Sequence, residues 1–178
     1  EDEEPGKVLF EKIPSLRPAF EKNGTITAAN ASKINDGAAA LMITNSHILK
    51  DQNFKNPFQI ISQASTAQEP EWFTTAPIQA IKKVLKIAGL NAGDINLWEI
   101  NEAFAPVVMA AVDEFHLDWN CVNIKGGAIA LGHPIGASGA RILVTLIHSM
   151  IENNAKLGLA TLCIGGGEAS ALIVEKVG

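Results

Sequence analysis

Residues 126–139 carry the stretch G-G-A-I-A-L-G-H-P-I-G-A-S-G, in which five of fourteen residues are glycine. This density of glycine indicates a backbone that turns sharply or lets another group approach closely. A phosphate-binding loop is excluded, because no Lys-Ser/Thr pair follows the glycines and their spacing is not G-x-G-x-x-G. The stretch holds His133 between Gly132 and Pro134, a rigid setting that suits an imidazole aimed at a target. For His133 taken alone, a turn histidine in solvent is the favoured interpretation.

Outward from this stretch, apolar strands alternate with amphipathic helices. Helical spacing of apolar residues predicts one helix from an N-cap at Thr75 to Gly89, a second over residues 104–115 and a third over residues 142–150. Five strands are predicted, at residues 58–65, 95–100, 122–125, 157–164 and 169–177. This order, closed by two consecutive strands, is typical of an α/β fold with a mixed five-stranded sheet.

The N-terminal part differs from the rest in composition. Residues 1–33 are polar and irregular, whereas residues 37–44 form the apolar run G-A-A-A-L-M-I-T. Such a run predicts a strand buried on both faces. The chain becomes polar again at residues 53–57, where we place a boundary. No sister strands for residues 37–44 are predicted, so we expect another polypeptide to cover this run unless it packs differently or self-associates.

Two further loops place polar or reactive groups beyond predicted strands, where ligands tend to bind in α/β sheets. Asn101-Glu102-Ala103-Phe104 follows the strand at residues 95–100, and the simplest interpretation is that Asn101 caps the next helix. Cys163 ends the strand at residues 157–164 and precedes Gly165, Gly166 and Gly167. A buried structural cysteine is the usual case. Three glycines, however, leave backbone N–H groups unshielded beside a thiol, as an oxyanion hole requires.

Composition and charge exclude several classes of protein. The chain of 178 residues is 47% hydrophobic and 19% charged, which is typical of a globular protein, and its net charge of −5 offers no basic field for nucleic acid or an acidic membrane. Two cysteines are too few for a disulfide scaffold and favour a reducing compartment. No histidine is spaced with a cysteine as a zinc ligand pair, so no metal site is predicted. The acidic start without Met is no signal peptide and suggests a piece of a longer protein.

Taken together, these blocks resemble the thiolase family, through C-I-G-G-G at residues 163–167, N-E-A-F at residues 101–104, the glycine-rich stretch and N-A-S-K-I-N-D-G-A-A-A at residues 30–40. The resemblance covers almost the whole chain. It implies that residues 1–33 end the CoA-binding loop region, residues 34–56 return to the N-terminal thiolase domain, and residues 57–178 form the C-terminal thiolase domain. Thiolases stack two α/β halves, with helices on both faces of each sheet and the active site between the halves.

The same resemblance implies roles for individual residues. His133 matches the residue that activates a nucleophilic cysteine, and Cys163 matches the acid/base at the α-carbon of acetyl-CoA. Asn101 matches the residue that holds a water in one oxyanion hole, and the Gly165 N–H matches a donor of the second. Ser32 matches a contact to the pantetheine arm of CoA. No covalently bound cofactor is implied, and coenzyme A thioesters are the expected substrates.

The implied enzyme is an acetyl-CoA acetyltransferase, which condenses two acetyl-CoA molecules to acetoacetyl-CoA and catalyses the reverse thiolysis. The intact triple glycine after Cys163 favours this type over the alternative, a 3-ketoacyl-CoA thiolase of β-oxidation, although Glu168-Ala169-Ser170 departs from the commoner glycine two residues further on. Neither cysteine matches the nucleophile, since Cys163 is the acid/base and Cys121 is interpreted as structural. We therefore expect the nucleophile in a missing N-terminal half, and the chain alone to be inactive in acyl transfer.

Partners and location follow from the family alone. We expect acetyl-CoA, acetoacetyl-CoA and the N-terminal thiolase half as partners, and a homodimer or homotetramer at full length. A non-catalytic fragment that serves assembly is the alternative from another functional class. The expected compartment is the cytoplasm, with the mitochondrial matrix as the alternative.

Overall fold

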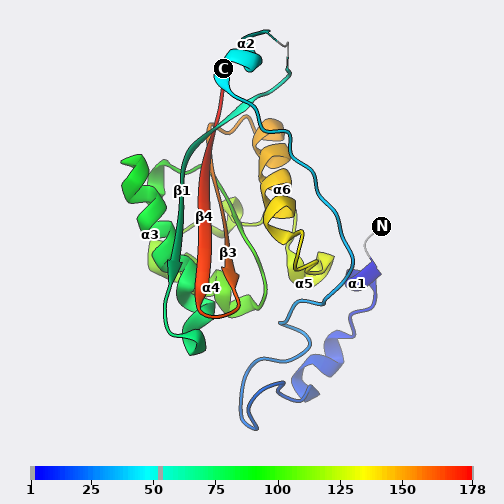
Figure 1. Ribbon diagram of the computed structural model, residues 1–178. Helices are drawn as coiled ribbons and strands as arrows, with labels where there is room; N and C mark the ends of the chain where they lie inside the picture. Colours follow the sequence, from blue (N-terminus) through cyan, green and yellow to red (C-terminus); the bar gives the residue numbers. More distant parts are fainter. Residues whose placement is uncertain (1–2, 52–53, 178) are drawn as a thin grey trace.

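The computed structural model describes residues 3–51 and 54–177 and centres on a mixed sheet (Figure 1). The sheet has four strands in the order β1-β4-β3-β2. β1 pairs with β4 and β4 with β3 in antiparallel fashion, whereas β3 and β2 are parallel. The strands are β1 (Phe58–Ala67), β2 (Leu97–Ile100), β3 (Leu157–Ile164) and β4 (Glu168–Lys176). Four of the five predicted strands are thus confirmed to within two residues at each end.

The predicted fifth strand, at residues 122–125, is wrong. Val122 forms a single bridge to Trp98, after which a positive φ of 48° at Asn123 turns the backbone away from the sheet. The Asn123 side chain then takes the place of a neighbouring strand, since Oδ1 accepts from Ile100 N at 2.8 Å and Nδ2 donates to Ile100 O at 2.8 Å. Because a side chain satisfies these backbone groups, the sheet ends at β2.

Helices cover both faces of the sheet, as expected (Figure 1). α3 (Ala76–Ala88) and α4 (Ala105–Phe115) lie on one face, and α6 (Ser138–Glu152) lies on the other. Consecutive residues of a strand point to opposite faces, so Leu159 packs with the α3/α4 cluster while Ala160 packs with the α6 cluster. The shorter elements are α1 (Glu3–Gly6), η1 (Phe10–Ser15), α2 (Ser46–Asp51), η2 (Pro70–Thr75), η3 (Ala92–Asp94), η4 (Trp119–Cys121) and α5 (Ala128–Leu131).

The ends of α3 match the sequence prediction in position. Gly89 terminates it with φ +68°, and its N–H donates to the carbonyls of Leu85 and Lys86. Thr75 precedes the first turn, but its hydroxyl donates to Trp72 O at 3.0 Å and does not cap the helix. Pro77 lies in the first turn, where its missing N–H is tolerated.

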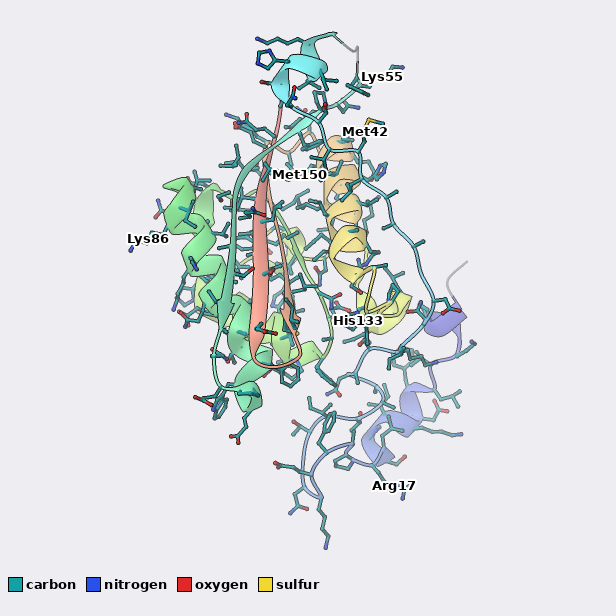
Figure 2. All side chains as sticks on the ribbon, viewed as in Figure 1. Arg17, Met42, Lys55, Lys86, His133 and Met150 are labelled. Atoms are coloured by element: carbon teal, nitrogen blue, oxygen red, sulfur yellow. The ribbon has the colours of Figure 1, made fainter. Side chains whose placement is uncertain are left out.

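The predicted strand at residues 37–44 is also wrong. This segment follows the outer side of α6 as extended chain, away from the sheet (Figure 1). Met42 and Ile43 are each 79% exposed, and the Met42 side chain points away from the fold (Figure 2). A strand needs neighbours for its backbone groups, and the described part of the chain supplies none here. None of the described helices has the length and apolar character needed to cross a membrane.

Candidate active site

The N-terminal segment at residues 30–37 is hydrogen-bonded to the loop that follows β2. The backbone N and the hydroxyl of Ser32 both donate to Ala103 O, at 3.1 and 3.0 Å. Ala105 N, at the start of α4, donates to Asn30 O at 2.9 Å. We call residues 30–37 the brace, because they hold this loop and the glycine-rich loop in place.

The other end of the brace fastens the glycine-rich loop. His133 N donates to Lys33 O at 2.7 Å. Gly132 has φ +96°, and a Cβ at this position would lie 2.5 Å from the Asn35 side chain. The positive φ disfavours a side chain at residue 132, and a Cβ there would also displace the Asn35 side chain. The brace and the glycine together determine where the His133 backbone lies.

The two loops bring Asn101 and His133 together. Asn101 is 1% exposed, and its Nδ2 lies 3.5 Å from His133 Nε2. Asn101 N donates to Thr161 O of β3 at 3.0 Å, so this strand positions the Asn101 backbone. His133 is half-buried at the end of α6 that lies nearest α5 (Figure 2). The capping interpretation of Asn101 is wrong, because α4 begins at Ala105 with Phe104 as its N-cap residue.

A buried serine contacts Nδ1 of His133 and favours the tautomer with the proton on that nitrogen. Ser138 Oγ lies 2.6 Å from His133 Nδ1 and donates its own proton to Pro134 O at 3.1 Å. The hydroxyl has one proton, so both contacts are made when Nδ1 donates to Oγ and Oγ donates to Pro134 O. Burial, and next the nearby Arg141 cation, lower the pKa of His133. The imidazole is thus held neutral, with the lone pair of Nε2 directed to the Asn101 amide.

Cys163 lies close to the carboxyl end of β3, opposite Ala169 of β4. Its side chain is 7% exposed and belongs to the cluster on the α3/α4 face, together with Ala103. Within residues 3–51 and 54–177, no hydrogen bond joins its thiol to Asn101 or His133. Burial raises the pKa of the Cys163 thiol. The thiol is therefore protonated near neutral pH in this chain.

The triple glycine forms the turn between β3 and β4. Gly166 and Gly167 have φ of +94° and +90°, and a Cβ at Gly167 would collide with Gln68 O. A Cβ at Gly165 would meet no atom within 4 Å. Gly167 is accordingly required by the turn itself, whereas Gly165 borders open space.

The sequence did not predict the side chains that hydrogen-bond to the site loops and stabilise them. Glu102 Oε2 accepts from Ile129 N at 3.1 Å, and its Oε1 accepts from Asn123 Nδ2 at 3.3 Å. A Cβ at Gly127 would collide with the same carboxylate. Glu102 and Ser138 both belong to the quoted motifs, and their polarity within glycine-rich loops was the available signal. Glu99 and Arg141 gave none, because each sits within an otherwise regular element.

Comparison with known proteins identifies the family. The family model "Thiolase, C-terminal domain" matches residues 54–176, and "Thiolase, N-terminal domain" matches residues 1–47. The chain is 51% identical to a probable acetyl-CoA acetyltransferase of Dictyostelium discoideum, over 99% of this chain and 43% of that protein. It is 50% identical to the mitochondrial acetyl-CoA acetyltransferase of Mus musculus, over 99% of this chain and 42% of that protein. It therefore spans about two fifths of the length of these relatives.

Solved structures show the same fold. The Acat5 thiolase of Ascaris suum, in complex with coenzyme A, matches with a TM-score of 0.89 and 46% identity, over 99% of this chain and 46% of that one. Human mitochondrial 3-ketoacyl-CoA thiolase matches with a TM-score of 0.90 and 36% identity, over 99% of this chain and 45% of that one. The C-terminal model alone covers more than half of the chain, so the chain belongs to the thiolase family.

Proposed function

We propose that the protein of which this chain forms part is an acetyl-CoA acetyltransferase, which condenses two acetyl-CoA molecules to acetoacetyl-CoA and cleaves the product in reverse. The observation that carries the proposal is the pairing of His133 with Asn101, a neutral imidazole whose Nε2 lies 3.5 Å from a buried amide. The relatives named acetyl-CoA acetyltransferase, at 51% and 50% identity, support this substrate class.

In this proposal His133 acts as a general base. Its Nε2 takes the proton from a nucleophilic thiol, which then attacks the thioester carbon and forms an acyl-enzyme. Ser138 keeps the other ring proton on Nδ1, so that Nε2 is free at each turnover. The Asn101 amide, directly or through a water molecule, donates to the oxygen on which negative charge develops. A preset donor of this kind is worth about 3–4 kcal/mol in other enzymes.

Cys163 and Gly165 serve the second half of the reaction. The protonated Cys163 thiol supplies or, once ionised, removes a proton at the α-carbon, and the Gly165 N–H stabilises the enolate oxygen. Ser32 contacts the pantetheine arm of CoA. Because the Ser32 hydroxyl donates to Ala103 O, it offers CoA a hydrogen-bond acceptor and suits an amide N–H of that arm.

The nucleophilic thiol comes, in this proposal, from an N-terminal half outside this chain. Cys121 is a poor candidate, since its thiol donates to Asp118 O at 2.9 Å and burial raises its pKa. Two surfaces suit a covering half. One is the exposed segment at residues 37–44, and the other is a hollow of about 470 Å³ beside α6, lined by residues of β1, β3 and β4 that include Ser65, Leu162 and Leu172.

The remaining details are proposals of the same kind. Residues 57–178 form the C-terminal thiolase domain, residues 34–56 return to the N-terminal domain, and residues 1–33 belong to the CoA-binding loop region. The full-length protein forms a dimer or tetramer of identical subunits, in the mitochondrial matrix or the cytoplasm; the mitochondrial name of the mouse relative favours the matrix.

The test is an acyl-transfer assay on the chain joined to an N-terminal thiolase half. We expect thiolysis of acetoacetyl-CoA, and a loss of about 10²–10⁴-fold in kcat for His133→Asn, the range for a general base. His148→Asn is the matched control, because His148 is exposed on α6. Preference for longer 3-ketoacyl chains would favour the 3-ketoacyl-CoA thiolase alternative. An assembled protein without acyl transfer, or equal kcat in both variants, would refute the proposal.

A further inference from the structure

Arg141 extends the polar chain behind Asn101. It lies in α6, one turn after Ser138, with its side chain 18% exposed. Its NH2 donates to Asn101 Oδ1 at 3.4 Å, and its NH1 lies 3.7 Å from Glu99 Oε2. The Glu99 side chain is 2% exposed and comes from β2. A cation and a carboxyl are thus buried directly behind the amide that faces His133.

This arrangement is costly for folding. Arg141 Nε and NH1 are buried without a hydrogen-bond partner in the described part of the chain. Burial raises the pKa of Glu99 to about 8, against the opposing effect of Arg141, so the carboxyl is largely protonated near neutral pH. The guanidinium keeps its proton under these conditions and is therefore incompletely compensated. A buried cation with unpaired donors destabilises a fold, and a role at the adjacent site would explain why it is there.

The geometry indicates what Arg141 does to Asn101. A carboxamide has an acceptor at one end and donors at the other. With the cation at Oδ1, the N–H end must face His133 Nε2. The flipped amide would set its N–H group against the guanidinium and its oxygen against the Nε2 lone pair, and both contacts are repulsive. Polarisation by the cation also makes the N–H group a stronger donor.

We propose that Arg141, which lies beside the buried Glu99 side chain, is a positioning residue that locks the Asn101 amide with its N–H group toward His133 and strengthens that group as a donor. The catalytic meaning of this role rests on the proposed acyl-transfer function, but the geometry is testable without it. The charged and titratable groups around Arg141 are Glu99 from β2, Glu102 from the loop after β2, His133, and Asp36 of the brace, which lines a small cavity with Arg141.

The test is NMR on the full 178-residue chain with ¹⁵N-labelled histidine and asparagine. The main variant is Arg141→Met/Glu99→Gln, which removes the guanidinium and the carboxyl together, so that neither group is left buried without the other. We expect the Asn101 side-chain N–H protons to exchange with water roughly tenfold faster or more, as loss of a hydrogen bond to a charged group implies. We also expect His133 to titrate at higher pH, because a nearby cation is gone. Arg17→Gln is the matched control, since Arg17 is exposed and is the other arginine of the chain.

A second variant keeps the test decisive if the double variant does not fold. Arg141→Lys keeps the positive charge but loses the planar fork, so we expect faster Asn101 exchange with little change in the His133 titration. Unchanged Asn101 exchange in a folded Arg141 variant would overturn the proposal. These readouts are independent of acyl transfer. An inactive assembled enzyme with the expected NMR changes would refute the proposed function and leave the positioning role intact. An active assembled enzyme without those NMR changes would refute the positioning role and leave the proposed function intact.

Discussion

Replacement of Ser138 by alanine removes the hydroxyl that contacts Nδ1 of His133 and favours one imidazole tautomer. The hydroxyl lies 2.6 Å from His133 Nδ1 and 3.1 Å from Pro134 O, and Ser138 is fully buried. Ser138→Ala leaves the Nδ1–H group without this partner, whereas Pro134 O still accepts from the backbone N–H groups of Ala137 and Ser138, at 2.7 and 2.9 Å. An orphaned buried polar group destabilises a protein by about 1–3 kcal/mol. We expect a loss of this size in the free energy of unfolding, and a mixture of imidazole tautomers in place of Nδ1–H alone.

The free energy of unfolding is measured by urea denaturation, and the tautomer by the ¹⁵N shifts of the two ring nitrogens. Ser149→Ala is the matched control. Ser149 is also buried on α6, but its hydroxyl has no hydrogen-bond partner within the described ranges, so its removal should be neutral or stabilising. The reasoning is refuted if both alanine variants unfold at the same urea concentration and His133 keeps one tautomer in each.

Three further predictions concern the fold around the site. Gly167→Ala should lower the free energy of unfolding by about 1–3 kcal/mol in urea denaturation, because φ is +90° and the new Cβ would collide with Gln68 O. Gly165→Ala, the control, should lower it by less than about 0.5 kcal/mol. Equal losses in the two variants would contradict this explanation of the turn. Burial raises the pKa of Glu99 from 4.5 to about 8, so between these values the unfolded chain releases a proton that the folded chain keeps. Stability should therefore fall as pH rises from about 4.5 to about 8, by up to about 1.4 kcal/mol per pH unit, and Glu99→Gln should remove this contribution; an unaltered slope in the variant would count against it. Asn123→Ala should destabilise the edge of the sheet by about 1–3 kcal/mol, because it leaves both backbone groups of Ile100 without the side-chain amide. Asn120→Ala, in an exposed turn, is its control. A similar loss in the free energy of unfolding for Asn120→Ala would show that the pairing of the Asn123 amide with Ile100 contributes no additional stability.

Regular elements were predictable where local pattern and tertiary environment agree. The apolar stripe of α6 and the paired strands β3 and β4 bury the residues that their periodicities indicate. Residues 37–44 have the composition of a buried strand, but a strand forms only against neighbours, and the described chain has none for it. The strand prediction for residues 122–125 was wrong for a different reason. The left-handed backbone at Asn123 and its side-chain pairing with Ile100 depend on contacts that no periodicity shows.

The site was predictable only where a motif concentrates unusual residues. Asn101, His133 and Cys163 stand in or beside glycine-rich or strand-terminal blocks, and the structure places the first two in contact. Arg141 gives no such signal, because an arginine in an amphipathic helix normally faces solvent. Its contact with Asn101 joins residues 40 positions apart and arises only when α6 packs on β2.

We propose that the loops after β2 and before α6 form a site for a CoA thioester. The most direct measurement is a crystal structure of the assembled two-half protein with acetyl-CoA. We predict the thioester oxygen within hydrogen-bonding distance, about 2.7–3.2 Å, of Asn101 Nδ2 or of a water molecule that Asn101 Nδ2 holds. A thioester bound elsewhere, with His133 and Asn101 both remote from its oxygen, would contradict the account.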